Sequence, residues 1–186
     1  MDYTKIVGAN GARRKNDFYP TPPEATRALM DFLERRYLIR PGDHVWECAA
    51  GDGDMVRVLE ERYFVQGTDI REGIDFLETE IKNMDERAGI RWIITNPPFT
   101  LAEQFIRHAN ELGVPFAFLL KSQYWHSGKR LRLFEEITPR YVCPLTWRPD
   151  FTGQGNSLMD MCWVIWMPGT ADQTSYIPMR RPGKKK

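Results

Sequence analysis

The sequence predicts an α/β fold with a doubly wound, mostly parallel sheet and helices on both faces. Two observations predict it. Apolar runs of strand length alternate with amphipathic segments of helix length, and the connections between them are short. This alternation favours parallel strands joined by crossover helices. With 186 residues, 42% of them hydrophobic, the chain can bury a core of ordinary size for one domain.

The first helix is expected to begin at Pro22 or Pro23, because proline is favoured in the first helical turn. Thr21 and Glu24 have the spacing of a capping box, which predicts Thr21 as the N-cap. After this helix, strands are expected over residues 65–70, 89–99, 114–121, 140–147 and 161–168, preceded by a short one from His44. The remaining helices are expected over residues 55–64, 101–113 and 129–137.

The chain is expected to divide into a flexible basic arm (1–17), one domain (18–168) and a basic C-terminal tail (169–186). It contains no run of 18 apolar residues and no basic-then-apolar leader, so we expect a cytoplasmic protein without a membrane partner. The three cysteines are widely spaced in apolar runs, which favours reduced packing residues over disulfides or a metal site.

The net charge of +1 conceals an asymmetry. Residues 43–111 carry 15 acidic and 7 basic side chains, whereas residues 112–186 carry 11 basic and 5 acidic ones, and residues 1–42 are also basic. Solvated surface is one explanation. The other is that the basic flanks meet a polyanion while the acidic middle serves a different ligand.

The stretch ECAAGDGD (47–54) follows the first expected strand and precedes a helix. Its small residues let a ligand approach the backbone, and the helix start offers free N–H groups. Val56 stands where a dinucleotide fingerprint needs its third glycine, and the loop is acidic. These features favour a ligand with positive charge, and the alternative is a tight turn without a ligand.

Asp69 ends the next expected strand, about twenty residues after the glycine loop. A carboxylate at this place can accept both hydroxyls of a ribose. Asp75 and Phe76 follow, and could meet an adenine ring through its amino group and its face. The alternative for this pair is a helix cap and a core aromatic.

Residues 96–99, NPPF, follow a buried-looking strand. Two prolines lack N–H groups and fix φ, so the segment presents a rigid row of carbonyl acceptors beside the Asn96 amide. Such acceptors suit an amino group on a planar carbon, whose lone pair becomes available as its N–H groups are held. Phe99 would stack on that planar group. The alternative is a proline stop for a buried strand, with Phe99 as a hydrophobic lid.

The order of FYPTP, ECAAGDG, TD, IDFL and NPPF resembles the class I S-adenosylmethionine-dependent methyltransferases, and among them the small, phage-type enzymes that methylate adenine N6 in DNA. The match covers residues 18–166, and NPPF is its most specific element. The resemblance implies a Rossmann-like, seven-stranded sheet with an antiparallel last strand. It also implies that residues 18–168 form the catalytic domain.

The resemblance assigns roles to named residues. It implies that Asn96, Pro97, Pro98 and Phe99 are catalytic. It implies S-adenosylmethionine contacts from Tyr19, Pro20, Thr21, Glu47, Ala49, Gly51, Gly53, Asp69, Asp75 and Phe76. No metal is expected. The sequence departs from the family pattern because it has no sizeable extra domain for target recognition.

DNA is the expected partner because basic side chains follow the last crevice-forming strands, where they could hold phosphates while an adenine is flipped out. The candidates are Lys121, Lys129, Arg130 and Arg148. Trp147 and Phe151 lie in a loop that could close over the flipped base. Two alternatives stay open: methylation of RNA adenine or a protein glutamine amide, and an inactive nucleic-acid-binding subunit. A monomer or small homo-oligomer is expected.

Overall fold

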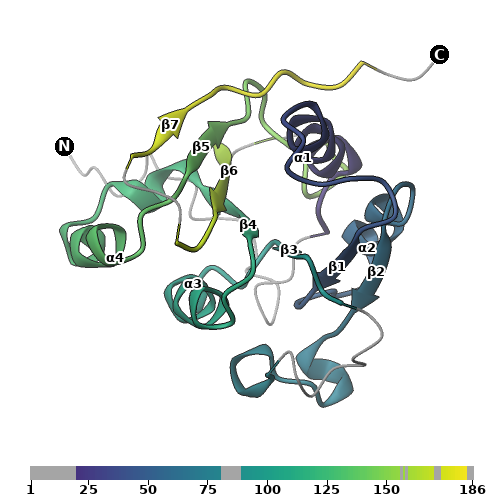
Figure 1. Cartoon of the computed structure of the whole chain (residues 1–186). Helices are drawn as coiled ribbons and strands as arrows, with labels where there is room; N and C mark the ends of the chain where they lie inside the picture. Colours follow the sequence, from purple (N-terminus) through teal and green to yellow (C-terminus); the bar gives the residue numbers. More distant parts are fainter. Residues whose placement is uncertain (1–19, 81–88, 156, 158, 170–172, 184–186) are drawn as a thin grey trace.

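The computed structural model describes residues 20–80, 89–155, 157, 159–169 and 173–183 (Figure 1). In this part of the chain, seven strands form one sheet in the order β2-β1-β3-β4-β6-β5-β7. Their bounds are β1 (His44–Glu47), β2 (Phe64–Gly67), β3 (Trp92–Thr95), β4 (Phe116–Lys121), β5 (Tyr141–Pro144), β6 (Met161–Trp166) and β7 (Ser175–Tyr176).

The helices are α1 (Pro23–Arg35), α2 (Asp54–Leu59), α3 (Ala102–Glu111) and α4 (Leu131–Glu136). Short 3-10 turns add η2 (Ile70–Glu72), η3 (Phe76–Glu78), η5 (Ser122–Trp125) and η6 (Gly128–Arg130). Strands therefore alternate with helical segments through most of the chain, as the sequence predicts.

The sheet is mostly parallel, which confirms the predicted fold class. Strands β2, β1, β3 and β4 pair in parallel, and β6 runs antiparallel between β4 and β5. The last strand identified from the sequence, β6, is thus the antiparallel one. The segment expected to be a basic tail supplies β7, which pairs in parallel with β5, and the buried Met179 beyond it.

Helices cover both faces of the sheet, and the strands alternate accordingly. Buried residues of α1 and α2 pack with Trp92 and Ile94 of β3 on one face. On the other face, α3 and α4 pack with Ile93, which points the opposite way from its neighbours. Figure 1 shows α1 and α2 on one side of the sheet and α3 on the opposite side.

Two predictions about element ends are wrong. The N-cap of α1 is Pro22 and makes no side-chain capping bond, so Thr21 and Glu24 form no capping box. The Thr21 hydroxyl instead accepts a hydrogen bond from Asn96, 75 residues away. The helix expected over residues 55–64 ends at Leu59, because Phe64 enters β2 and pairs with His44.

All three cysteines, Cys48, Cys143 and Cys162, are buried and unpaired, in agreement with the prediction that they are packing residues. None of the described helices is both long and apolar enough to cross a membrane.

Candidate functional site

A pocket of about 210 Å³ lies at the carboxyl ends of β1, β2 and β3. Parallel sheets bind ligands at this edge. The pocket brings together residues that were selected from five separate stretches of the sequence. These are Pro20, Thr21, Glu47, Ala49, Asp69, Asp75, Phe76, Asn96, Pro97, Pro98 and Phe99. Tyr19 lies outside the described residues.

Gly51 and Gly53 shape the loop without lining the pocket. Both have positive φ, +57° and +79°, a conformation that favours glycine. Gly53 is the N-cap of α2, and the Gly51 N–H donates to Asp69 Oδ2 at 2.8 Å. The glycines thus turn the chain sharply between β1 and α2, and Ala49 and Ala50 line the pocket in their place.

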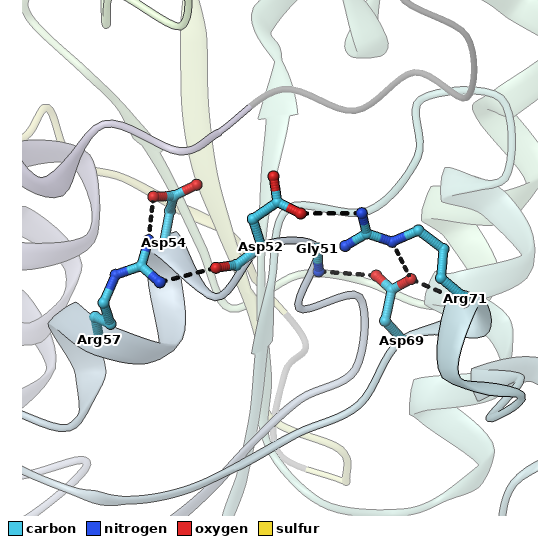
Figure 2. A network of polar contacts seen from close by, with 6 residues as sticks. All are labelled: Gly51, Asp52, Asp54, Arg57, Asp69 and Arg71. Atoms are coloured by element: carbon cyan, nitrogen blue, oxygen red, sulfur yellow. Dashed lines mark hydrogen bonds and ion pairs between the residues drawn. The ribbon is translucent and has the colours of Figure 1, made fainter.

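Asp69 lines the pocket and belongs to a polar network with Arg71, Asp52 and Gly51 (Figure 2). Its Oδ1 accepts from the Arg71 backbone N–H at 3.0 Å and from Arg71 Nε at 2.8 Å. Arg71 also donates to Asp52 Oδ1 at 3.0 Å, so it joins η2 to the glycine loop. Burial raises the pKa of Asp69, but the hydrogen bonds from Arg71 and Gly51 outweigh it and hold the pKa below its usual value. Asp69 is therefore an ionised acceptor at neutral pH.

Glu47 ends β1 and is buried at the base of the pocket. Its Oε1 accepts from the Ala49 backbone N–H at 3.2 Å and from the Thr95 hydroxyl. Burial raises its pKa to about 7, because the two hydrogen bonds compensate only part of the desolvation of the charged form. Glu47 thus changes charge near neutral pH, in contact with the ligand space.

Asn96 follows β3 and lies beside Thr21, which precedes α1. Its Nδ2 donates to Thr21 Oγ1 at 3.1 Å, which fixes the orientation of the amide. Its Oδ1 is buried and has no hydrogen-bond partner within the described part of the chain. Buried polar atoms are rarely left without a partner. The amide oxygen is thus an available acceptor on a residue that lines the pocket.

Phe99 lines the same pocket and packs on the core. The ammonium of Lys121, the last residue of β4, lies 3.9 Å from the centroid of its ring. Such a contact is a cation–π interaction. The pocket-lining ring of Phe99 therefore has the positive charge of Lys121 directly beside it.

Asp75 and Phe76 have structural roles in addition to their place at the pocket. Asp75 caps η3 by accepting from the Leu77 backbone N–H at 2.9 Å. Phe76 is buried in the core against Trp46 and Phe105. Contact with an adenine stays a prediction for both residues.

The pocket residues that were not selected from the sequence include Ile70, Arg71 and Ile74. Ile70 is 66% exposed and Ile74 is 39% exposed, so both present apolar surface at the pocket. The signal in the sequence is the stretch IREGI directly after Asp69, where two isoleucines stand four residues apart among charged residues. Ile70 and Ile74 could provide an apolar surface on which an aromatic ring of a ligand packs.

The four basic residues predicted to contact DNA have different environments. Lys121 lies over Phe99, and Lys129 is exposed. Arg130 stacks on Tyr124 with its Cζ 4.0 Å from the ring centroid, and Arg148 pairs with Asp160 at 2.8 Å. Phe151, expected to close over a base, is instead buried in the core, and Trp147 packs against that core.

The ionisable side chains around the pocket are mainly acidic. Glu47, Asp54, Asp69 and Asp75 line it, together with the guanidinium of Arg71. Within the described ranges, no group of three His, Cys, Asp or Glu could hold a metal ion. The side-chain chemistry favours an organic ligand with positive charge and hydroxyl groups.

No protein-family model and no curated protein sequence matches the chain. Solved structures do. A candidate class I S-adenosylmethionine-dependent methyltransferase from Listeria monocytogenes matches with a TM-score of 0.62 and 12% identity, over 92% of this chain and 68% of that one. The chain shares this fold. The modification subunit of a candidate type I restriction enzyme from Vibrio vulnificus matches with a TM-score of 0.61 and 14% identity, over 91% of this chain.

The present chain spans only 48% of that restriction subunit. A candidate RNA methyltransferase from Pyrococcus horikoshii matches with a TM-score of 0.52 and 14% identity, over 82% of this chain and 88% of that one. The shared fold therefore occurs in proteins with different descriptions, among them a restriction-enzyme modification subunit and an RNA methyltransferase. The substrate of this chain has to be argued from its own site.

Proposed function

We propose that this protein is an S-adenosylmethionine-dependent methyltransferase that modifies the exocyclic amino group of adenine in DNA. The observation that carries the proposal is the buried, unpartnered Oδ1 of Asn96 in a pocket shared with Asp69 and Glu47. An acceptor atom at this point suits an amino group that must be held by its N–H groups while its lone pair reacts.

The residues of the pocket fit the proposed cofactor. S-adenosylmethionine supplies a methyl group on a positively charged sulfonium, together with a ribose and an adenine. Asp69 is an ionised acceptor suited to ribose hydroxyls, and the small side chains of Ala49 and Ala50 leave room beside it. Ile70 and Ile74 offer apolar surface for the adenine, and the surrounding carboxylates favour positive charge.

The chain's contribution to transfer is mainly positioning. Asn96 Oδ1 and the carbonyl row of the two prolines accept hydrogen bonds from the acceptor amino group, which directs its lone pair toward the methyl carbon. The nitrogen–carbon bond forms as the carbon–sulfur bond breaks, and the extra proton on nitrogen goes to water. Thr21 holds the Asn96 amide for this task through its hydroxyl.

Two further features support a nucleotide as acceptor. Phe99 provides an aromatic face at the pocket, and stacking on such a face contributes roughly 1–3 kcal/mol per base. The Lys121 ammonium beside that ring could pair with a phosphate next to the stacked base. The modification subunit that shares the fold belongs to a candidate restriction enzyme, a class that acts on DNA, which makes DNA the first acceptor to test.

The test is transfer of a labelled methyl group to a panel of duplex DNA, single-stranded DNA, RNA and glutamine-containing peptide, followed by mass spectrometry of the digested products. We expect the label in N6-methyldeoxyadenosine. Label in RNA or peptide would show that the substrate is that molecule and not DNA. If calorimetry shows no binding of S-adenosylmethionine, the whole proposal is wrong.

A matched pair of variants tests the role of Asn96. Asn96→Ala is expected to lower the transfer rate by roughly 100-fold or more, the usual effect of losing one such stabilising group, with nearly unchanged cofactor affinity. The control Asn110→Ala removes an asparagine of α3 that does not line the pocket, and it should keep the wild-type rate. Near-normal transfer by Asn96→Ala would remove the proposed mechanism.

A further inference from the structure

Glu47 lies at the base of the pocket with neutral hydrogen-bond donors around it. It is 1% exposed, and it accepts from the Ala49 N–H at 3.2 Å and from the Thr95 hydroxyl. Both bonds go to Oε1, and Oε2 receives none from the described part of the chain. No described cation pairs with this carboxyl group. Within these residues, Glu47 therefore has no charge partner.

The other carboxylates that line the pocket have different surroundings. Asp69 pairs with the guanidinium of Arg71. Asp54 pairs with that of Arg57, and Figure 2 shows both ion pairs. Asp75 is half-buried and caps η3. Each of these groups is thus either paired with a cation or partly exposed to water, whereas the buried glutamate is neither.

A buried carboxylate without a cation is costly, so the group keeps its proton until a positive charge comes close. Burial raises the pKa of Glu47 to about 7, and the hydrogen bonds from Thr95 and Ala49 offset only part of this effect. The negative charge of Asp69 acts in the same direction as burial. The neighbouring Cys48 stays a neutral thiol, because burial raises its pKa well above the usual value. A cation that enters the pocket lowers the pKa of a nearby carboxyl group.

We propose that Glu47, held by Thr95, exchanges one proton for the positive charge of the cofactor, and so distinguishes the methyl donor from its demethylated product. This inference rests on the proposed function, in which a sulfonium enters this pocket. Glu47 loses its proton when the cationic donor binds. When the carbon–sulfur bond breaks, a neutral thioether remains, the methylated amine gives one proton to water, and Glu47 takes one proton up from water.

Thr95 suits both states of the carboxyl group. A hydroxyl can donate to the ionised carboxylate and can accept from the protonated acid. Thr95 is fully buried and directly precedes Asn96. The exchange at Glu47 therefore requires no movement of the segment that is proposed to hold the acceptor amine.

The exchange predicts a preference for the donor that depends on pH. Donor and product differ by one methyl group and one positive charge, so an ionised carboxylate favours the donor and a protonated one favours neither. The affinity ratio of S-adenosylmethionine to S-adenosylhomocysteine should therefore rise roughly tenfold from pH 6 to pH 7.5 and then level off. Dividing this ratio by that of Glu47→Gln removes the titrations of the ligands themselves.

Calorimetry at pH 6.5 measures the proton directly. Each ligand is titrated in phosphate and in imidazole buffer, which differ in their heat of ionisation, so the difference in heat counts the released protons. Binding of S-adenosylmethionine to the wild type should release roughly three quarters of a proton, the fraction carried at this pH by a group with a pKa of about 7. Binding of S-adenosylhomocysteine should release almost none. In Glu47→Gln the two ligands should give the same value.

Thr95→Val tests the residue that holds the carboxyl group, with a readout that altered packing does not mimic. The rise of the affinity ratio should move to higher pH, because the hydroxyl stabilises the ionised form of Glu47. Thr95→Ser keeps a hydroxyl and should keep the wild-type pH range. Thr26→Val is the matched control, because it removes a buried hydroxyl of α1 that has no hydrogen-bond partner among the described residues. Melting curves verify that all variants fold.

Three results would each overturn this inference and leave the proposed function in place. They are equal proton release by both ligands in the wild type, a wild-type difference between the ligands in Glu47→Gln, and an unmoved pH range in Thr95→Val. Failure of the wild-type protein to bind either ligand would overturn the proposed function as well.

Discussion

At the scale of single residues, the site depends on polar groups whose environments differ over short distances. Glu47 and Asp69 line one pocket, yet burial raises the pKa of Glu47 to about 7, whereas hydrogen bonds that outweigh burial lower that of Asp69. The difference follows from the donors. Asp69 receives bonds from a guanidinium and two backbone N–H groups, and Glu47 receives one backbone bond and a hydroxyl.

The raised pKa of Glu47 predicts a pH-dependent stability. The unfolded chain ionises this carboxyl near its ordinary pKa of about 4.5, whereas the folded protein ionises it only near 7, so its contribution to stability is lost as pH rises between these values. Glu47→Gln removes the titration. Its free energy of unfolding relative to wild type should therefore rise by about 2 kcal/mol from pH 5 to pH 8.

Urea denaturation at both pH values measures this change. Glu135→Gln, which replaces an exposed glutamate of α4, should show no such trend. If the difference between Glu47→Gln and wild type were the same at pH 5 and pH 8, the carboxyl would not be desolvated as described. The same variant should bind a cationic cofactor more weakly at pH 8, where wild-type Glu47 is charged.

At the scale of elements, the pocket depends on how closely α2 and the glycine loop approach β2. Gly67 ends β2, opposite Glu47 in the sheet register. A Cβ at Gly67 would lie 3.0 Å from Val56 Cγ2 and 3.4 Å from Ala50 Cβ. Valine is stiff at χ1, so the contact would have to be relieved by moving α2 or the loop.

Gly67→Ala is therefore expected to destabilise the fold by roughly 1 kcal/mol, within the usual range for overpacking. It should also weaken ligand binding, because Ala50 lines the pocket. The second mutation Val56→Ala frees the space, so Gly67→Ala in that background should be neutral or stabilising. A double-mutant cycle by urea denaturation isolates this coupling, and additive effects would show that the packing is not the cause.

At the scale of the whole molecule, the general architecture follows from the sequence because it rests on periodicity. Apolar runs of strand length and short connections were sufficient to predict a mostly parallel sheet with helices on both faces. The NPPF segment was likewise predictable, because Pro-Pro after a buried strand restricts the backbone locally. The sequence also placed Asp69 and the glycine loop at the same edge of the sheet, as the structure finds.

The remaining features depend on contacts between distant segments. Thr21 was expected to cap a helix, but its hydroxyl holds Asn96 across 75 positions of sequence. The raised pKa of Glu47 comes from burial by neighbouring strands, which periodicity does not quantify. Arg71 looked like one of many surface charges until its place between Asp52 and Asp69 was visible.

The C-terminal segment also requires the tertiary structure to be understood. Its composition is polar and basic, yet Met179 is buried with the α1 side of the core, and Leu145 forms a bridge with it. Arg181 then pairs with Glu24 of α1 at 3.0 Å. The segment thus ties the β5 edge of the sheet to the first helix, which lies next to the pocket-lining Thr21.

Met179→Ala is accordingly expected to lower the free energy of unfolding by about 2–3 kcal/mol, as for other buried methionines. Tyr176→Ala is the control, because Tyr176 lies in β7 but is 70% exposed, so its truncation should change stability by less than about 1 kcal/mol. Urea denaturation of both variants checks the difference. Equal effects would mean that the segment is held only by backbone pairing with β5, and that the buried Met179 side chain contributes nothing to the link with α1.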